Sequence, residues 1–199
     1  MSTNDTVLVL ANGEAGNKQI TESHVNRAIR NQTGPAAIFQ AALNHVCLEL
    51  AKMIVKDGEG VSRFVTVRLS GARSASDAEN AARAVANSSL VKTSWCGGDP
   101  NWGRVLCALG YSDARIAEDK VDVGYSANGD RTITYALKRG QPTDVPFASL
   151  CQITTRPEFE LHINLNVGKF GTVIYASDLT EEYVDFNKGD VTDPASLGG

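Results

Sequence analysis

The sequence predicts an α+β fold in which helices and strands form layers. Residues 159–167 alternate apolar and polar side chains, which is the pattern of a strand with one buried face. Residues 36–55 repeat apolar side chains at intervals of three and four, which is typical of an amphipathic helix. Helices and strands are mixed along the chain, with hairpin turns and few long apolar strands. This order favours α+β layers over a doubly wound parallel sheet.

In the first third of the chain the patterns predict a short strand and two helices. The apolar run 7–10 ends at an Asn-Gly turn signal and is typical of a strand. Thr21 can cap a helix over 22–30, because the first amide groups of a helix have no partners within it. The helix over 36–55 ends with Lys56 in its last turn and Gly58 just beyond it. Its expected buried stripe consists of Phe39, Leu43, Val46, Leu50 and Met53 with Ile54.

The middle of the chain is predicted to contain strands at 63–69 and 89–95, a helix through 85 and a helix at 102–109. Ser76 and Glu79 form a capping-box pattern at the start of the first of these helices. Alanines at positions 78, 81 and 82 predict that this helix packs closely on a sheet. The run 89–95 leads into a glycine pair, and either Asp99 or Asn101 can cap the helix that follows.

The second half of the chain is richer in strands. We expect them at 120–125, 132–137, 159–167 and 172–176. The turn 169–171 is expected to join the last two as a hairpin. Asp178 or Thr180 then caps a short helix that ends near Phe186. Residues 193–199, which include Pro194 and several small residues, are expected to form a mobile tail.

Composition limits the classes of function. The 199 residues, 42% of them hydrophobic, are enough for one domain with a core. A net charge of −4 argues against nucleic acid or an anionic membrane as partner. We expect no membrane span and find no signal-peptide pattern at the N-terminus, so the sequence predicts a soluble cytoplasmic protein. The scattered cysteines predict free thiols in a reducing compartment and no metal site; they are Cys47, Cys96, Cys107 and Cys151.

Four ordered blocks of sequence carry a family resemblance. The most specific is residues 87–111, NSSLVKTSWCGGDPNWGRVLCALGY, and the others are residues 2–13, 55–60 and 177–187. From Ser2 to Thr192 the chain resembles the second half of the ornithine acetyltransferases, the bifunctional glutamate N-acetyltransferases of arginine biosynthesis. The resemblance implies that residues 1–192 are part of the second (beta) subunit. It also implies an α-β-β-α layered sandwich of the N-terminal-nucleophile aminopeptidase-like type, shared between two subunits.

The same resemblance implies where the catalytic groups lie. Family members are made as one precursor that cleaves itself before a threonine, and this new N-terminal threonine carries the acetyl group. No match to the Ala-Thr-Met-Leu-like motif around that threonine occurs in this chain. We therefore expect no catalytic residue here, and no activity from the chain alone. The oxyanion donors belong to the first (alpha) subunit, which is the expected partner in an α2β2 heterotetramer.

Three residues are expected to bind the amino-acid substrate. Glu59, between two glycines, taken alone resembles an exposed turn acid. The matching glutamate of the family binds the substrate, and its carboxylate would pair with the ornithine ammonium. Asn187 and Thr192 stand five positions apart, as do an asparagine and a terminal threonine or serine of the family's substrate site. This chain continues past Thr192, and residues 188–191 depart from the usual family sequence.

Five residues of the most recognisable block receive no catalytic role. Trp102 and Arg104 are interpreted as structural, an aromatic side chain that fills space and a guanidinium that satisfies turn carbonyls. The full set is Lys92, Asp99, Asn101, Trp102 and Arg104.

The resemblance implies acetyl transfer from N-acetylornithine to glutamate through an acetyl-threonine intermediate, with no metal or bound cofactor. Some family members also accept acetyl-coenzyme A, so this co-substrate stays open. Two alternatives remain. One is a non-catalytic half that only assembles with a partner. The other is an aminopeptidase of the same fold, in which Ser2 becomes the nucleophile after removal of Met1.

Overall fold

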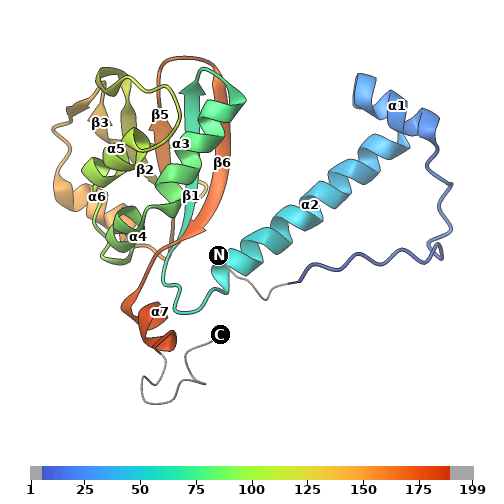
Figure 1. Ribbon diagram of the computed structural model, residues 1–199, viewed down its shortest axis with the longest axis horizontal. Helices are drawn as coiled ribbons and strands as arrows, with labels where there is room; N and C mark the ends of the chain where they lie inside the picture. Colours follow the sequence, from blue (N-terminus) through green and yellow to red (C-terminus); the bar gives the residue numbers. More distant parts are fainter. Residues whose placement is uncertain (1–5, 189–199) are drawn as a thin grey trace. The chain divides into compact units, whose positions relative to one another are not determined.

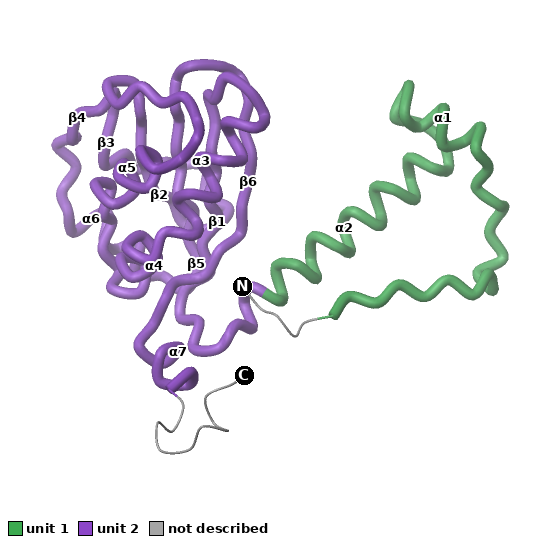
Figure 2. Tube along the Cα trace, viewed as in Figure 1, with its two compact units in different colours: residues 1–54 green, residues 55–199 purple. Residues whose placement is uncertain are grey.

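The computed structural model describes residues 6–188 and divides the chain into two compact units (Figure 2). The boundary falls between Ile54 and Val55, near the end of a long helix. The first unit holds two helices, and the second holds a mixed six-stranded sheet with the remaining helices.

In the first unit, α1 spans Glu22–Asn31 and α2 spans Pro35–Lys56, which confirms both predicted helices. The backbone N–H of Thr21 donates to Nδ1 of His24 at 3.2 Å, at the start of α1. α1 ends at Gln32, whose backbone is left-handed and whose N–H donates to the carbonyl of Ala28 at 2.9 Å. Proline suits the first position of α2, because its fixed φ is helical and its missing N–H would have no partner there.

The strand predicted at 7–10 is wrong. These residues are irregular and their side chains are exposed, with Leu10 at 84%. A strand requires a neighbour that supplies hydrogen bonds, and none of the six described strands pairs with this segment.

The burial predicted for α2 is also wrong, although the helix itself is present. Only Ala36 of this helix is buried, and Phe39, Val46 and Met53 of the expected stripe are more than half exposed. Periodicity fixes which side chains share a face, but burial needs a partner surface. By length and composition alone, α2 also passes the test for a membrane-crossing helix, with a mean hydropathy of 1.3. The expectation that no segment is long and apolar enough to cross a membrane is therefore wrong by length and composition. Core helices of water-soluble proteins also meet both criteria.

The second unit is built on one sheet with the strand order β4-β3-β2-β5-β1-β6. β1 runs parallel to β5, and every other neighbouring pair is antiparallel. The strands are β1 Phe64–Ala72, β2 Asp122–Ala127, β3 Thr134–Lys138, β4 Gln141–Pro142, β5 Glu158–Asn164 and β6 Phe170–Ser177. The strands predicted at 63–69, 120–125, 132–137, 159–167 and 172–176 are therefore present, with shifted ends.

The predicted hairpin between the last two strands is wrong, because β1 lies between β5 and β6. After β5, the N–H groups of Leu165 and Val167 donate to the carbonyls of Ser70 and Gly71 at 3.0 and 2.8 Å, in the last residues of β1. The chain then crosses that end at Gly168, where a Cβ atom would lie 2.1 Å from the carbonyl oxygen of Ala72. Glycine permits this close crossing.

The strand predicted at 89–95 is instead a helix. α3 spans Ala75–Asn87, and α4 follows it directly over Ser89–Cys96. Val91 and Trp95, one helical turn apart, are both buried, so the apolar residues of this run share one helical face. The cap of α3 is Ser74 rather than Ser76: its Oγ accepts from the N–H of Asp77 at 3.0 Å. Glu79 pairs instead with Arg83, one turn along.

Helices pack on one face of the sheet, and Figure 1 shows α3 in front of β1 and β6. Val65 and Val67 of β1 and Phe159 and Leu161 of β5 have no exposed surface on this face. The predicted alanines of α3 are fully buried as well, and their small side chains allow close packing. The other helices are α5 Trp102–Gly110, the 3-10 helix η1 Glu118–Lys120, α6 Phe147–Thr154 and α7 Glu181–Phe186.

The opposite face of the sheet carries a polar network. Arg68 donates twice to the buried carboxylate of Glu160, at 2.5 and 2.8 Å. Nε2 of His162 lies 2.9 Å from Oγ of Ser126 and 3.4 Å from Glu160. The Arg68 hydrogen bonds hold the pKa of Glu160 below its usual value, and burial lowers the pKa of His162. A sheet with a helix layer on one face confirms the α+β class and is consistent with a layered α-β-β-α fold.

Candidate functional site

Glu59 lies at the tip of an exposed turn that follows α2. The N–H of Val61 donates to the carbonyl of Gly58 at 3.1 Å and closes the turn. Gly60 has a φ of +64°, which the third position of a type II turn requires and which favours glycine. Among the described residues, Glu59 has no hydrogen bond or ion pair. The predicted exposed carboxylate is confirmed, and it is available to a ligand.

Asn187 lies at the other end of the short helix α7. Its Nδ2 donates to the carbonyl of Tyr183 at 2.8 Å, and its side chain is exposed. Thr180 caps the start of this helix, because its Oγ1 accepts from the N–H of Tyr183 at 3.1 Å. About 10 Å of helix therefore separates Thr180 from Asn187. Thr192, the third predicted substrate-binding residue, lies outside the described residues.

The structure brings the Glu59 turn against the start of α7. Oγ1 of Thr180 donates to the carbonyl of Gly60 at 2.7 Å, across 120 residues of sequence. A Cβ atom on Gly60 would lie only 2.7 Å from the backbone nitrogen of Tyr183. Two of the three predicted substrate-binding residues, Glu59 and Asn187, thus belong to segments in direct contact.

Asp178 forms a buried hub directly behind this contact. Its carboxylate accepts from the N–H groups of Ser62 and Arg63, both at 3.0 Å, and from Oγ of Ser62 at 2.5 Å. Only 4% of the residue is exposed. Hydrogen bonds to a carboxylate are stronger than neutral ones, so this group fixes the start of β1 to the end of β6. The alternative that Asp178 caps α7 is wrong.

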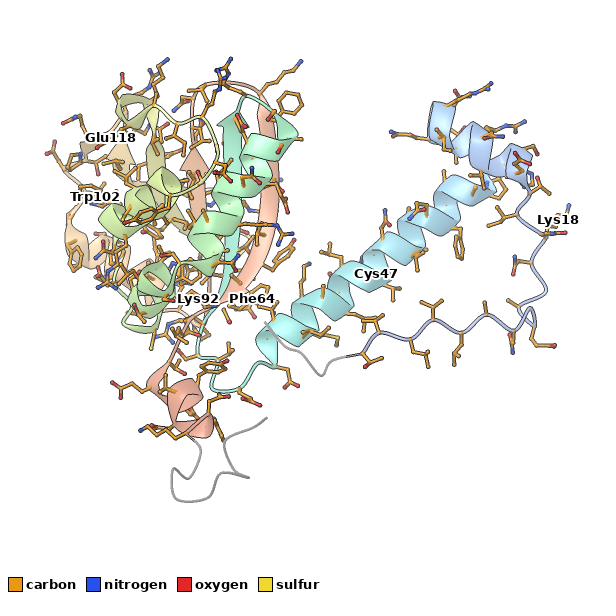
Figure 3. All side chains as sticks on the ribbon, viewed as in Figure 1. Lys18, Cys47, Phe64, Lys92, Trp102 and Glu118 are labelled. Atoms are coloured by element: carbon orange, nitrogen blue, oxygen red, sulfur yellow. The ribbon has the colours of Figure 1, made fainter. Side chains whose placement is uncertain are left out.

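Lys92 ties α4 to the same segment. Its Nζ donates to the carbonyl of Ser177 at 2.5 Å, and its own carbonyl accepts from the N–H of Leu179 at 3.3 Å. Burial lowers the pKa of Lys92, and the nearby negative charge of Asp178 acts in the opposite direction. Figure 3 shows Lys92 near the lower end of the unit, towards α7. Sequence reasoning gave Lys92 no role, although Ser177 to Thr180 belonged to a recognised block.

Burial raises the pKa of the Cys96 thiol, with a further contribution from Asp178. This shift keeps the sulfur protonated and disfavours a nucleophilic thiolate. Across residues 6–188, no group of three or more histidine, cysteine, aspartate or glutamate side chains is placed to hold a metal ion.

The recognisable block around Trp102 has structural contacts. Oδ1 of Asn101 accepts from the N–H of Arg104 at 3.0 Å, so the predicted Asn101 cap of α5 is confirmed. Asp99 accepts from Nδ2 of Asn101 at 2.9 Å. Arg104 donates to the carbonyl of Leu90 at 2.8 Å, and Trp102 packs against the core. The guanidinium has the structural contact that the sequence interpretation proposed, but its partner is a carbonyl of the helix α4 and not of a turn.

The fold and the site define a class: an α+β unit that presents a free carboxylate on a rigid turn beside a short helix. The sequence model of the ArgJ family matches residues 1–190. The chain belongs to the ArgJ family.

Known relatives agree with this assignment. The chain is 43% identical over 190 residues to the glutamate N-acetyltransferase of Methanocaldococcus jannaschii. It is 40% identical over 187 residues to the arginine biosynthesis bifunctional protein ArgJ of Geobacter sulfurreducens. In both cases the match covers 94% of this chain but only 44% of the relative, so the chain spans less than half the length of either.

A solved structure is similar as well. It is the crystal structure of arginine biosynthesis bifunctional protein ArgJ from Bacillus halodurans, with 32% sequence identity and a TM-score of 0.77. The match covers 94% of this chain and 81% of that one.

Proposed function

We propose that this chain supplies the amino-acid-binding wall of an acetyltransferase that moves an acetyl group from N-acetylornithine to glutamate. Family membership supports the reaction class. The observation that carries the proposal is the unpaired carboxylate of Glu59 on a turn held rigidly against α7. A fixed, exposed carboxylate suits the side-chain ammonium of ornithine, which neutral analogues lack.

The reaction divides into two acyl transfers. The hydroxyl oxygen of a threonine outside this chain attacks the acetyl carbonyl of N-acetylornithine, and its proton passes to the departing amine. The C–N bond breaks, ornithine leaves and an acetyl-threonine ester remains. The amine of glutamate then attacks the ester carbonyl, the ester C–O bond breaks, and a proton from that amine passes to the threonine oxygen and restores the hydroxyl. Within this scheme Glu59, Asn187 and Thr192 bind and orient the amino acid.

The proposal includes a partner and a compartment. The nucleophile is the N-terminal threonine of the second subunit, and the oxyanion donors belong to the first subunit, which cleavage of a shared precursor releases. Neither lies in the part of the relatives that this chain spans. The assembly is an α2β2 heterotetramer in the cytoplasm. No metal or bound cofactor takes part, and acetyl-coenzyme A serves at most as a second acetyl donor.

The test uses a reconstituted enzyme, in which this chain is combined with the part of its relatives that it does not span. Glu59→Gln keeps the side-chain volume and removes the charge. A charged hydrogen bond is worth about 1.5–3 kcal/mol, so kcat/KM for N-acetylornithine should fall roughly ten- to hundredfold. The chain without its partner should show no turnover.

Glu118→Gln is the matched control. Glu118 is exposed on η1, towards the opposite end of the unit from α7 (Figure 3). Glu118→Gln removes one negative charge, as Glu59→Gln does. This control should leave kcat/KM unchanged. Equal kinetics for Glu59→Gln and the parent enzyme would refute the assignment of Glu59.

A further inference from the structure

The hydroxyl of Thr180 connects the two segments that carry the proposed substrate-binding residues. It donates to the carbonyl of Gly60 at 2.7 Å and accepts from the N–H of Tyr183 at 3.1 Å. A threonine hydroxyl has one proton to donate and lone pairs to accept, and here both roles are used. One side chain therefore caps α7 and holds the Glu59 turn.

The Glu59 turn and the start of α7 are packed so closely that no side chain fits at Gly60. A Cβ atom at Gly60 would lie 2.7 Å from the nitrogen of Tyr183 and 3.0 Å from Oγ1 of Thr180. The positive φ of Gly60 also disfavours any larger residue. This contact therefore fixes the tip of the Glu59 turn against the start of α7.

A second connection makes the Thr180 contact separable from the fold. Asp178 holds Ser62 and Arg63 at the base of the turn, and it is buried. Thr180 acts at the tip of the turn, near the surface. Loss of the Thr180 hydroxyl should therefore release the tip, while Asp178 keeps β1 and β6 joined.

We propose that Thr180 is a positioning residue that couples the Glu59 turn to α7, and so to Asn187, and thereby sets the geometry of the amino-acid site. The inference rests on the proposed function. It assigns to Thr180 no contact with the reacting atoms.

The experiment compares Thr180→Val, which removes the hydroxyl at nearly constant shape, with Thr180→Ser, which retains it. In the reconstituted enzyme Thr180→Val should raise KM for N-acetylornithine about tenfold, the effect of about one lost hydrogen bond, with kcat changed less than about twofold. Thr180→Ser should restore the parent KM. Hydrogen exchange of the backbone amides of residues 58–61 should become faster in Thr180→Val but not in Thr180→Ser.

Two further variants sharpen the test. Thr155→Val, at the end of α6, removes an exposed hydroxyl that donates to its own helix at 2.7 Å, and it should leave KM unchanged. Gly60→Ala forces the turn off α7 by the clash described above, and should raise KM as Thr180→Val does. If Thr180→Val assembles poorly with its partner, the KM of Gly60→Ala tests the positioning role independently.

Combination with Glu59→Gln separates this inference from the proposed function. If Thr180 positions Glu59, the penalty of Glu59→Gln should shrink in the Thr180→Val background, because contacting residues are not additive. A parent-like KM for Thr180→Val and Gly60→Ala, with the Glu59→Gln penalty intact, would overturn the positioning role and leave the proposed function standing. A silent Glu59→Gln in the parent background would overturn both.

Discussion

Replacement of Asp178 by asparagine should destabilise the second unit far more than its small change in shape suggests. The carboxylate accepts three hydrogen bonds, two from backbone N–H groups and one from the Ser62 hydroxyl. An asparagine of the same shape keeps one oxygen for the two N–H groups, which share Oδ1 of Asp178. Its NH2 group would face Oγ of Ser62, so that hydroxyl must accept instead of donate, and all three contacts lose the negative charge. The change occurs in a residue that is 4% exposed, where hydrogen bonds to a charge are stronger than in water.

The magnitude follows from these contacts. A hydrogen bond to a charged group contributes about 1.5–3 kcal/mol and a neutral one about 0.5–1.5 kcal/mol, so each of the three contacts loses about 1 kcal/mol. We therefore expect the free energy of unfolding to fall by about 2–4 kcal/mol. For a domain of this size this corresponds to a decrease in Tm of roughly 5–15 °C.

Urea unfolding followed by tryptophan fluorescence provides the assay. Both tryptophans, Trp95 and Trp102, belong to the second unit and pack in or against its core, so the signal reports on this unit. Asp144→Asn is the control, because Asp144 is exposed in the loop before α6. A free energy of unfolding within about 0.5 kcal/mol of the parent, the usual range of a surface change, would refute the role of Asp178.

Two other predictions concern pH and the C-terminal segment. Because Glu160 and His162 both have lowered pKa values in the folded protein, the unfolded chain binds more protons at acidic pH. The free energy of unfolding should therefore decline as pH falls below 6.5, the ordinary pKa of His162, and decline further below 4.5, the ordinary pKa of Glu160. In urea titrations, His162→Gln should remove only the decline that begins near pH 6.5. Deletion from Asn187 onward should abolish substrate binding in the reconstituted enzyme and leave precursor cleavage intact, whereas deletion of 193–199 should change neither; normal turnover after the long deletion would contradict the substrate site.

Local patterns in the sequence were sufficient for features that depend on neighbouring residues. The alternation in β5 correctly identified its buried apolar face, and the alanines of α3 correctly predicted close packing on the sheet. Thr180 and Asn101 were each one of two cap candidates, because capping joins residues only three positions apart; the structure chose between them and Asp178 and Asp99. The exposure of Glu59 followed from its flanking glycines. The family resemblance was also readable from the sequence, and the ArgJ family match bears it out.

Only the tertiary structure decided which elements meet. β5 and β6 are consecutive strands but not neighbours, because β1 occupies the place between them. The run 89–95 became a helix because Val91 and Trp95 bury together against the core. The contact of Thr180 with Gly60 and the Asp178 hub join residues more than a hundred positions apart. Sequence periodicity reports the face that an element buries, whereas the partner for that face is chosen by long-range packing, which no local pattern encodes.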